Sequence, residues 1–394
     1  MIRSLCKTRG LSAGLLIAGL FTFSVGIQAS GSASAASKPT YLVGVPMPMT
    51  GAEAQQGTEI FDGEALAVAQ INKAGGLLGH KIVLNEQDDA CDPQTAVSAN
   101  NLLVSKGVKA VVGDYCSGTA LVTEPIISKA KLPLVLPDAN SPTLTSGGFK
   151  NVFLIDPSSS GDATEAATFF KNVLHETKIA IVDDQSSFAV SVAQLAQTDI
   201  QKDGGTVAGS IQAVPPTTTD FSSVIAAIQG SGAKGIYWTG YYSQAALFAK
   251  QLEAAGLIGQ GGSMSFVVAD SSVDPTFISG AGAAATGTYA TIAVPGQFLK
   301  GSKANQFNAA YKKAYHSAPG PYSAYGYDSI QVLAQAARNA KSLTPTKVTA
   351  ALHKIRISGL TGTISFAANG SRQGCKFVVL TVANGNYVLA PKQP

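Results

Sequence analysis

Residues 41–86 read YLVGVPMPMTGAEAQQGTEIFDGEALAVAQINKAGGLLGHKIVLNE and carry the pattern that decides the fold. The apolar run Tyr41–Pro46 is typical of a buried strand, and Lys81–Glu86 carries alternating apolar residues as a second strand does. Between them, Gly57–Ala74 repeats apolar residues at helical spacing and ends before two glycines, where helices commonly terminate. A strand, a helix and a strand in this order predict a right-handed βαβ unit with parallel strands.

The same alternation continues downstream and restarts once, near residue 157. A helix is expected over Asp162–Leu174, and strands and helices then alternate as far as the strand Ser265–Ala269. Two successive runs of this kind predict two α/β lobes. Near the C-terminus we expect a hairpin that pairs Thr363–Phe366 with Phe377–Val382.

Length and composition narrow the class of protein. The chain has 394 residues, which is more than one core usually supports. Hydrophobic residues make up 45% and charged residues only 13%, so a packed core is available and a disordered polyelectrolyte is excluded. The formal net charge of +4 comes mainly from three basic residues before position 10. No Lys/Arg cluster exists, so we expect no nucleic-acid partner.

The N-terminus has the three parts of a secretory signal peptide. Arg3, Lys7 and Arg9 form a basic start, Leu11–Ile27 is apolar, and small residues follow. We therefore interpret residues 1–36 as a cleaved signal peptide. No later apolar stretch reaches spanning length, which predicts an exported, soluble mature chain.

Catalytic signatures are missing from the sequence. There is no H-E-x-x-H, no P-loop, no G-x-S-x-G and no zinc-type Cys/His spacing. The acidic run Glu86, Asp88 and Asp89 could form a metal site or a carboxylate pair, but we interpret it as a solvated strand end. We expect no enzyme, no metal and no cofactor.

Several motifs together carry a family resemblance. They are INKAGGLLG at 71–79, DDACDP at 88–93, GDYCS at 113–117 and PDANSPTLT at 137–145. In order and spacing the chain resembles, from Tyr41 to Tyr387, the periplasmic leucine/isoleucine/valine-binding protein family, which serves ABC importers. The joint order of the motifs carries this resemblance, because no single motif is decisive.

The resemblance implies a fold, a domain division and a disulfide. The fold would be α/β, with two doubly wound parallel-sheet lobes joined by three crossing strands and the ligand between them. The first lobe would comprise residues 37–156 plus 290–365, and the second 157–289 plus 366–394. The family disulfide matches Cys91 and Cys116, a pair that exported proteins permit. Cys375 is left over, and we expect it to be a buried free thiol.

The resemblance also implies ligand contacts, residue by residue. Ser117 matches a serine that binds the ligand carboxylate, at an expected helix N-terminus. Asp138, Ala139 and Asn140 match a loop that ends in threonine in the family. Asp138 is a departure: it would repel a ligand carboxylate if it pointed inward, and otherwise it points away or binds a different polar group.

The second lobe and the side-chain subsite match less closely. Asp270 replaces the family glutamate that pairs the ligand ammonium, and Tyr241 matches a family tyrosine. The further positions Gln56, Phe188 and Tyr322 carry other residue types than the family does, and Tyr115 is expected to face the same pocket. A purely aliphatic pocket is therefore not assured.

The function expected from these residues is a periplasmic receptor of an ABC importer. It would bind an amino acid or a similar small molecule in the interlobe cleft by hinge closure. Its partners would be the small molecule and the membrane permease and ATPase of the importer, and it would be a monomer. The alternatives are a receptor for an aromatic acid or a short amide, and, with less support, an exported hydrolase.

Overall fold

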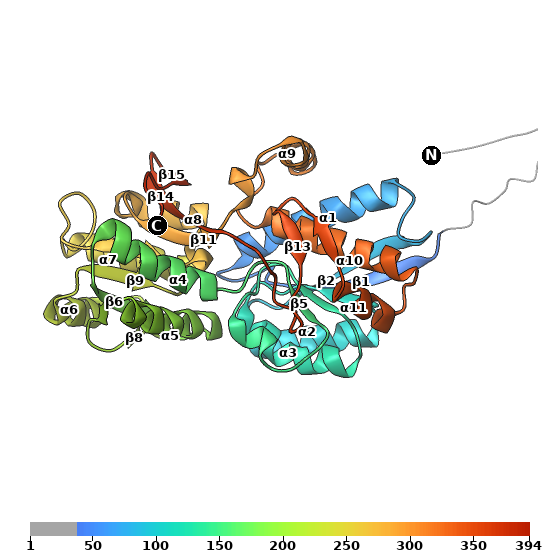
Figure 1. The fold of residues 1–394 in the computed structure, drawn as a ribbon, viewed down its shortest axis with the longest axis horizontal. Coiled ribbons are helices and arrows are strands. Elements are labelled where there is room, and N and C mark those ends of the chain that lie inside the picture. The colour runs from blue at the N-terminus through green and yellow to red at the C-terminus, as the bar shows by residue number, and fades with distance from the viewer. Residues whose placement is uncertain (1–37) are drawn as a thin grey trace, which may run out of the picture. The chain divides into compact units, whose positions relative to one another are not determined.

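The computed structural model describes residues 38–394, which form one compact unit (Figure 1). The expected signal peptide at 1–36 lies outside the described residues. Within 38–394, no helix combines the length and the apolar character that crossing a membrane requires.

The first lobe is built on a five-stranded parallel sheet in the order β2-β1-β3-β4-β5. Its strands are β1 (Thr40–Met47), β2 (Lys81–Asp88), β3 (Ala110–Val112), β4 (Leu134–Leu136) and β5 (Val152–Leu154). Helices of this part of the chain are α1 (Ala54–Lys73), α2 (Pro93–Ser105), α3 (Ser117–Lys129), α9 (Ser302–Tyr315), α10 (Ser323–Ala340) and α11 (Pro345–Leu352). The residues facing inward from β1, β3 and β4 are fully buried, which explains their apolar runs.

The second lobe is built on a mixed eight-stranded sheet. Its strands are β6 (Lys178–Asp183), β7 (Thr206–Val207), β8 (Gln212–Ala213), β9 (Gly235–Trp238), β10 (Ser265–Val268), β11 (Tyr289–Ala293), β14 (Phe377–Ala383) and β15 (Asn386–Leu389). Its helices are α4 (Ser160–Phe169), α5 (Ser187–Lys202), α6 (Ser222–Ser231), α7 (Tyr242–Ala254) and α8 (Pro275–Ala281). Strands β6 to β11 run parallel, whereas β14 and β15 are antiparallel.

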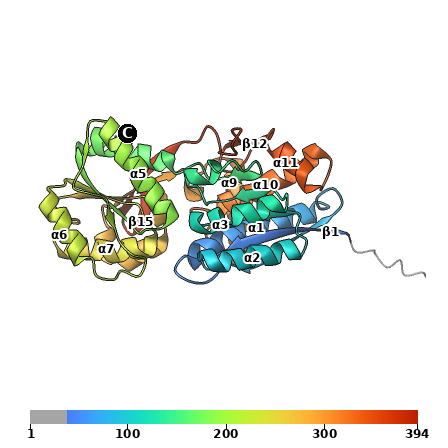
Figure 2. The same ribbon diagram turned by 90° about the horizontal axis from the view of Figure 1, so that it is seen from below.

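The chain passes between the two sheets three times, after β5, after β11 and before β14 (Figures 1 and 2). The predicted fold class is therefore confirmed. The boundary expected at residue 290 falls inside β11, which pairs in the second sheet, so the second passage begins after Ala293.

The predicted C-terminal hairpin is wrong. Strand β13 (Thr363–Ser365) pairs with β12 (Arg356–Ser358), while β14 pairs with β11 and β15. The backbone carbonyl of Gly370 accepts a hydrogen bond from Leu154 N–H at 3.0 Å, so the turn between the two expected strands packs on the first sheet instead. Local alternation marked the strands but did not choose their partners.

Helices α1 and α10 approach closely through two glycines. A Cβ added to Gly63 would lie 2.0 Å from the Ser323 carbonyl oxygen, and one added to Gly326 would lie 2.2 Å from the Ile60 carbonyl oxygen. No other residue type fits this contact without moving a backbone. The crossing fixes α10, and thereby Tyr322 at its start, against the first turns of α1.

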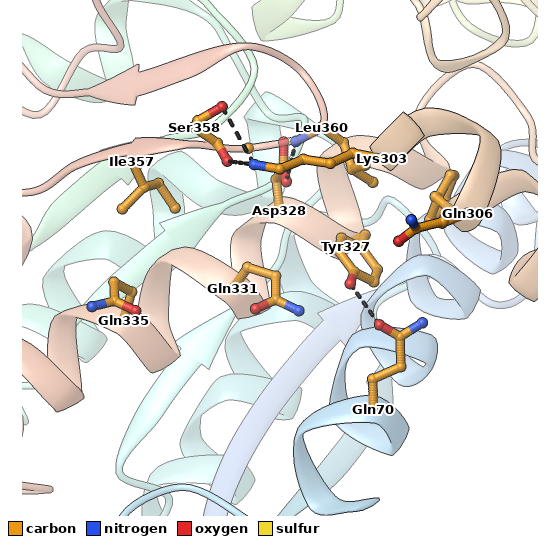
Figure 3. A pocket seen from close by; sticks show the side chains of 12 residues that line it. Gln70, Lys303, Gln306, Tyr327, Asp328, Gln331, Gln335, Ile357, Ser358 and Leu360 are labelled. Atoms are coloured by element: carbon orange, nitrogen blue, oxygen red, sulfur yellow. Dashed lines mark hydrogen bonds between the residues drawn. The ribbon is translucent and has the colours of Figure 1, made fainter. Parts of the chain in front are cut away.

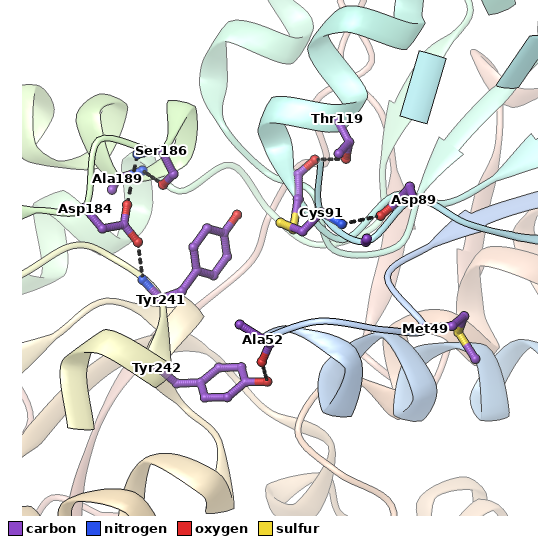
Figure 4. The surroundings of a disulfide bond; sticks show 12 residues. Met49, Ala52, Asp89, Cys91, Thr119, Asp184, Ser186, Ala189, Tyr241 and Tyr242 are labelled. Carbon is purple, nitrogen blue, oxygen red and sulfur yellow. Dashed lines mark hydrogen bonds between the residues drawn. A yellow bond between two sulfur atoms is a disulfide. The ribbon is translucent and has the colours of Figure 1, made fainter. Parts of the chain in front are cut away.

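The disulfide expected between Cys91 and Cys116 is present, with the two Cα atoms 5.6 Å apart. It joins the loop after β2 to the residue that precedes α3 (Figure 4). Cys375 is free, as predicted, but it is half-buried rather than buried, because it lies in the passage before β14 and not within the strand.

Candidate functional site

The candidate site lies where the carboxyl ends of the strands of both sheets meet. Tyr115 follows β3, Asp138 follows β4 and Asp156 follows β5, whereas Tyr241 follows β9 and Asp270 follows β10. The loops at this end of parallel strands are where α/β proteins place ligands.

Seven side chains, four of them named above, line one small cavity between the lobes. They are Tyr115, Asp138, Asn140, Phe188, Tyr241, Asp270 and Ser271. The cavity measures about 10 Å³, room for about one water molecule. Six of the seven are among the positions expected from the sequence. Ser271 was missed, because a serine in the short turn after β10 follows no pattern, and its hydroxyl donates to the Gly240 carbonyl oxygen at 2.9 Å.

Asn140 joins the two lobes directly. Its side-chain amide donates one hydrogen bond to Asp156 Oδ2 and one to Asp270 Oδ2, both at 2.8 Å. Asp156 directly follows the first sheet, whereas Asp270 belongs to the second lobe. All three residues are buried, so neither hydrogen bond competes with bulk water.

Four buried carboxyl groups cluster around this amide. Asp156 and Asp270 accept its two hydrogen bonds. Asp138, in the loop after β4, and Asp162, in the first turn of α4, lie close enough to both that the carboxyl groups of Asp156 and Asp270 raise the pKa of each.

Burial raises the pKa of all four carboxyl groups. Burial first, and the neighbouring carboxyl groups second, raise the pKa of Asp138, Asp156 and Asp162 well above the usual range. The pKa of Asp270 is also raised by burial, but the hydrogen bond from Asn140 favours its charged form and opposes that shift. Asp270 therefore faces the Asn140 amide, and within residues 38–394 it forms no ion pair with a basic side chain.

Positive charge is scarce around the cluster. None of the seven cavity residues is basic. Arg372 is buried and lowers the pKa of Asp156, but its hydrogen bonds go to backbone oxygens and to the Thr361 hydroxyl. Within residues 38–394 the one ion pair, Lys171 with Asp203 at 4.0 Å, lies away from the cavity.

Aromatic rings form the remaining wall of the cavity. The ring centres of Tyr115 and Tyr241 are 5.7 Å apart, and those of Phe188 and Tyr241 are 5.9 Å apart. Figure 4 shows Tyr241 extending from the second lobe toward the disulfide of the first. The Tyr115 hydroxyl is buried and has no hydrogen-bond partner within the described part of the chain.

The other four expected positions do not line the cavity. Ser117 is the first residue of α3, and its hydroxyl accepts a hydrogen bond from Ser141 N–H at 3.3 Å. Ala139 is buried in the loop after β4. Gln56 is buried in the first turns of α1, and Tyr322 donates its hydroxyl proton to the Asp270 carbonyl oxygen.

The acidic run at the end of β2 is the expected solvated strand end only in part: Glu86 is exposed, Asp88 is half-buried and Asp89 is buried. Asp88 caps the neighbouring loop by accepting hydrogen bonds from Met49 N–H and Ala90 N–H, both at 2.9 Å. Asp89 is fully buried and accepts a hydrogen bond from Cys91 N–H at 2.8 Å, and Asp114, whose pKa it raises, is also fully buried. Asp89 was misread because its partner arrives from another strand. The described residues contain no group of three or more side chains placed to hold a metal ion.

A hollow larger than the cleft cavity lies elsewhere in the first lobe. It measures about 400 Å³ and lies between α1, α9, α10 and β12 (Figure 3). Its lining is rich in glutamine; Lys303 Nζ donates to the Ser358 carbonyl oxygen at 2.8 Å, and the Tyr327 hydroxyl donates to Gln70 Oε1 at 2.6 Å. None of the expected site residues lines it, and no chemistry predicted from the sequence maps there.

Comparison with known proteins places the chain in a family. A family model for periplasmic binding proteins matches residues 40–386, which is nearly the whole described chain. The chain belongs to this family. It is 30% identical over 314 residues to the Leu/Ile/Val-binding protein homolog 1 of Brucella melitensis, covering 79% of this chain and 81% of that protein.

Two further relatives cover even more of the sequence. The leucine-, isoleucine-, valine-, threonine- and alanine-binding protein of Pseudomonas aeruginosa is 27% identical, over 94% of each chain. The crystal structure of the branched-chain amino acid transporter substrate-binding protein LivJ from Streptococcus pneumoniae, in complex with isoleucine, is 26% identical. It superposes with a TM-score of 0.78 over 89% of this chain and 100% of that one. The protein is thus a substrate-binding protein of the branched-chain amino acid ABC transporter family, and its relatives bind solutes.

Proposed function

We propose that this protein is the periplasmic receptor of an ABC importer and that it binds an amino-acid-like small molecule between its lobes. The observation that carries the proposal is the cavity to which both lobes contribute strand-end side chains, with Asn140 bonded across it to Asp270. Such a site is complete only when the lobes are together.

Ligand entry then requires the lobes to separate. A cavity of about 10 Å³ is far smaller than the roughly 300–1,000 Å³ of small-molecule pockets. The three passages between the sheets are where such a hinge motion would be absorbed. A ligand stabilises the closed form only by the difference between its affinities for the two forms.

In this proposal each subsite has a role. The ligand amino group binds Asp270 and the face of Tyr241. The hydrogen-bond-accepting end of the ligand lies toward Ser117. There the free N–H groups at the start of the 13-residue helix α3 favour an acceptor group. Phe188 and Tyr115 enclose the rest of the molecule, with Gln56 and Tyr322 behind them.

Export to the periplasm and delivery to a membrane permease with its ATPase follow from the family and from the expected signal peptide. We propose a monomer that presents both lobes to the permease after closure. No catalytic step is assigned, because the cavity holds carboxyl and aromatic groups but no nucleophile paired with a base.

The test is thermal unfolding of the exported chain after bound molecules have been removed by unfolding and refolding. A ligand present at 100 times its Kd adds about 2.7 kcal/mol to the unfolding free energy. A shift with amino acids but not with their deaminated acids supports the proposal. Shifts with aromatic acids or short amides alone would transfer the receptor role to those ligands. A panel without any shift would contradict the proposed function.

A further inference from the structure

We propose that the ligand of this cleft carries a net positive charge, as a basic amino acid or a diamine does, in place of a neutral branched-chain amino acid. This inference rests on the proposed receptor function and narrows its ligand class. It is carried by the surplus of acidic side chains around the cavity and by the absence of a basic side chain among the residues that line it.

The surplus is larger than one ammonium group would need. Asp156 and Asp270 accept hydrogen bonds from Asn140, and Asp138 and Asp162 are buried close to both. Glu59 adds a fifth buried carboxyl group. Its Oε1 accepts a hydrogen bond from the backbone N–H of Tyr322 at 2.9 Å.

Arg372 does not balance this charge within the cavity. Its guanidinium group donates to the carbonyl oxygens of Ile155, Thr361 and Thr363 and to the Thr361 hydroxyl. Among the residues that the structure describes, it forms no ion pair within 4.0 Å. It moderates the charge of Asp156 from behind and does not line the cavity. Buried charges without a partner are costly, and here the cost raises the pKa of the carboxyl groups. A cation that entered the cavity would stabilise their ionised forms.

Asp138 gives the evidence for the ligand class. It lines the cavity, it is only 6% exposed, and within residues 38–394 its Oδ1 accepts no hydrogen bond from an N–H or hydroxyl group. The Tyr115 hydroxyl, 4% exposed, is equally unpartnered in the described residues. An acceptor and a hydroxyl left free on one cavity wall fit a second donor group of the ligand, beyond the one that Asp270 receives.

A neutral amino acid fits this wall poorly. Its single ammonium group satisfies Asp270, but its carboxylate then enters a site that already has a negative surplus. A second ammonium or a guanidinium group placed at Asp138 offsets that surplus through charge-assisted hydrogen bonds. The faces of Tyr115, Phe188 and Tyr241 favour a cation further, because the ring quadrupole attracts positive charge.

The experiment compares ligands that differ only in this charge. Isothermal titration near neutral pH, on the refolded full chain, measures Kd for lysine against norleucine and for arginine against citrulline, with butane-1,4-diamine as a probe without a carboxylate. We expect each cationic member to bind about tenfold or more tightly than its neutral partner, which corresponds to about 1.4 kcal/mol. Tight binding of the diamine, with weak binding of lysine, would assign a diamine as the source of the charge.

Variants locate the effect. Asp138→Asn keeps the shape of the side chain and removes its charge, so we expect the lysine-to-norleucine ratio to fall toward one. The matched control is Glu176→Gln, because Glu176 accepts from the Ser265 hydroxyl at the opposite ends of the strands; it should leave the ratio unchanged. The ligand comparison on the unaltered chain decides the question even where Asp138→Asn fails to fold.

The outcomes separate this inference from the proposed function. Norleucine or leucine bound within about tenfold of lysine, or more tightly, would overturn the cationic ligand class and leave the receptor intact. Binding of neither the charged nor the neutral compounds would overturn both.

Discussion

Replacing Asn140 with alanine should open the protein. The Asn140 amide donates to Asp156 and to Asp270, both at 2.8 Å. Only the bond to Asp270 crosses between the lobes, so only that bond is lost when the lobes separate in the unaltered protein. Hydrogen bonds to charged groups contribute about 1.5–3 kcal/mol each. The closed form of Asn140→Ala is therefore expected to lose about that amount relative to the open form.

A loss of this size changes the closed-to-open ratio by about one to two orders of magnitude. Distances between spin labels on exposed positions of α2 and α6 would report the two forms, with and without ligand. Kd for the same ligand should rise by about tenfold or more, because closure completes the site.

The control variant is Asn100→Ala. Asn100 is also buried, but its side chain donates to the Ala96 carbonyl oxygen within α2, at 3.0 Å. It should lower stability without changing the label distances. If Asn140→Ala gave the same distances and Kd as the unaltered chain, or changed them no more than Asn100→Ala does, the interlobe bond would not stabilise closure.

Three further predictions concern stability. The buried cleft carboxyls have raised pKa values, so the folded state holds protons that the unfolded chain releases above about pH 4. The contribution of these protons to stability is complete below that pH, and it is lost as the pH rises through the pKa of the folded state. The Tm of the ligand-free protein should therefore fall between about pH 5 and pH 8, and a Tm that stays level or rises would contradict this. Replacing Cys91 and Cys116 together with serine releases a loop of sequence separation 25 and should lower the unfolding free energy in urea by about 3–4 kcal/mol, whereas a loss below about 1 kcal/mol would show that the unfolded chain stays compact without the bridge. Gly326→Ala drives a Cβ into the backbone of α1 and should lower the unfolding free energy by about 1–3 kcal/mol. The control Gly230→Ala, in α6 with open space around it, should be neutral or stabilising. Equal effects of the two variants in urea titrations would refute the close packing of α1 on α10.

Much of the site could be predicted because the family resemblance named its residues. The rule that loops after parallel strands meet at one edge of a sheet agreed with it. Tyr115, Asp138, Asn140, Tyr241 and Asp270 were expected together on that ground, and they do line one cavity. Their roles as ligand contacts stay predictions.

The rest depended on contacts between distant segments. Asp156 lies in a passage between the sheets and Asp162 in the first turn of a helix, two places where an aspartate is ordinary. Their burial beside Asp138 and Asp270 arises only when both lobes are assembled. Asp89 was misread for the same reason, because Asp114 reaches it from another strand.

The acidic cluster also bears on how closure would select a ligand. Asp138 and Asp156 follow strands of the first sheet, whereas Asp162 and Asp270 belong to the second lobe, so closing the lobes brings like charges together. Repulsion between carboxylates opposes that step unless protons or a cation intervene. If the ligand is a cation, as proposed, its positive charge binds the acidic side chains of the cavity and also removes the repulsion between them. The difference between its affinities for the closed and open forms therefore increases. A neutral ligand would have to rely on protons in the carboxyl groups, and its affinity would then fall as pH rises, whereas the affinity for a cation would increase. Measuring Kd of lysine and of norleucine between about pH 5 and pH 8 separates the two mechanisms by the direction in which each Kd changes with pH.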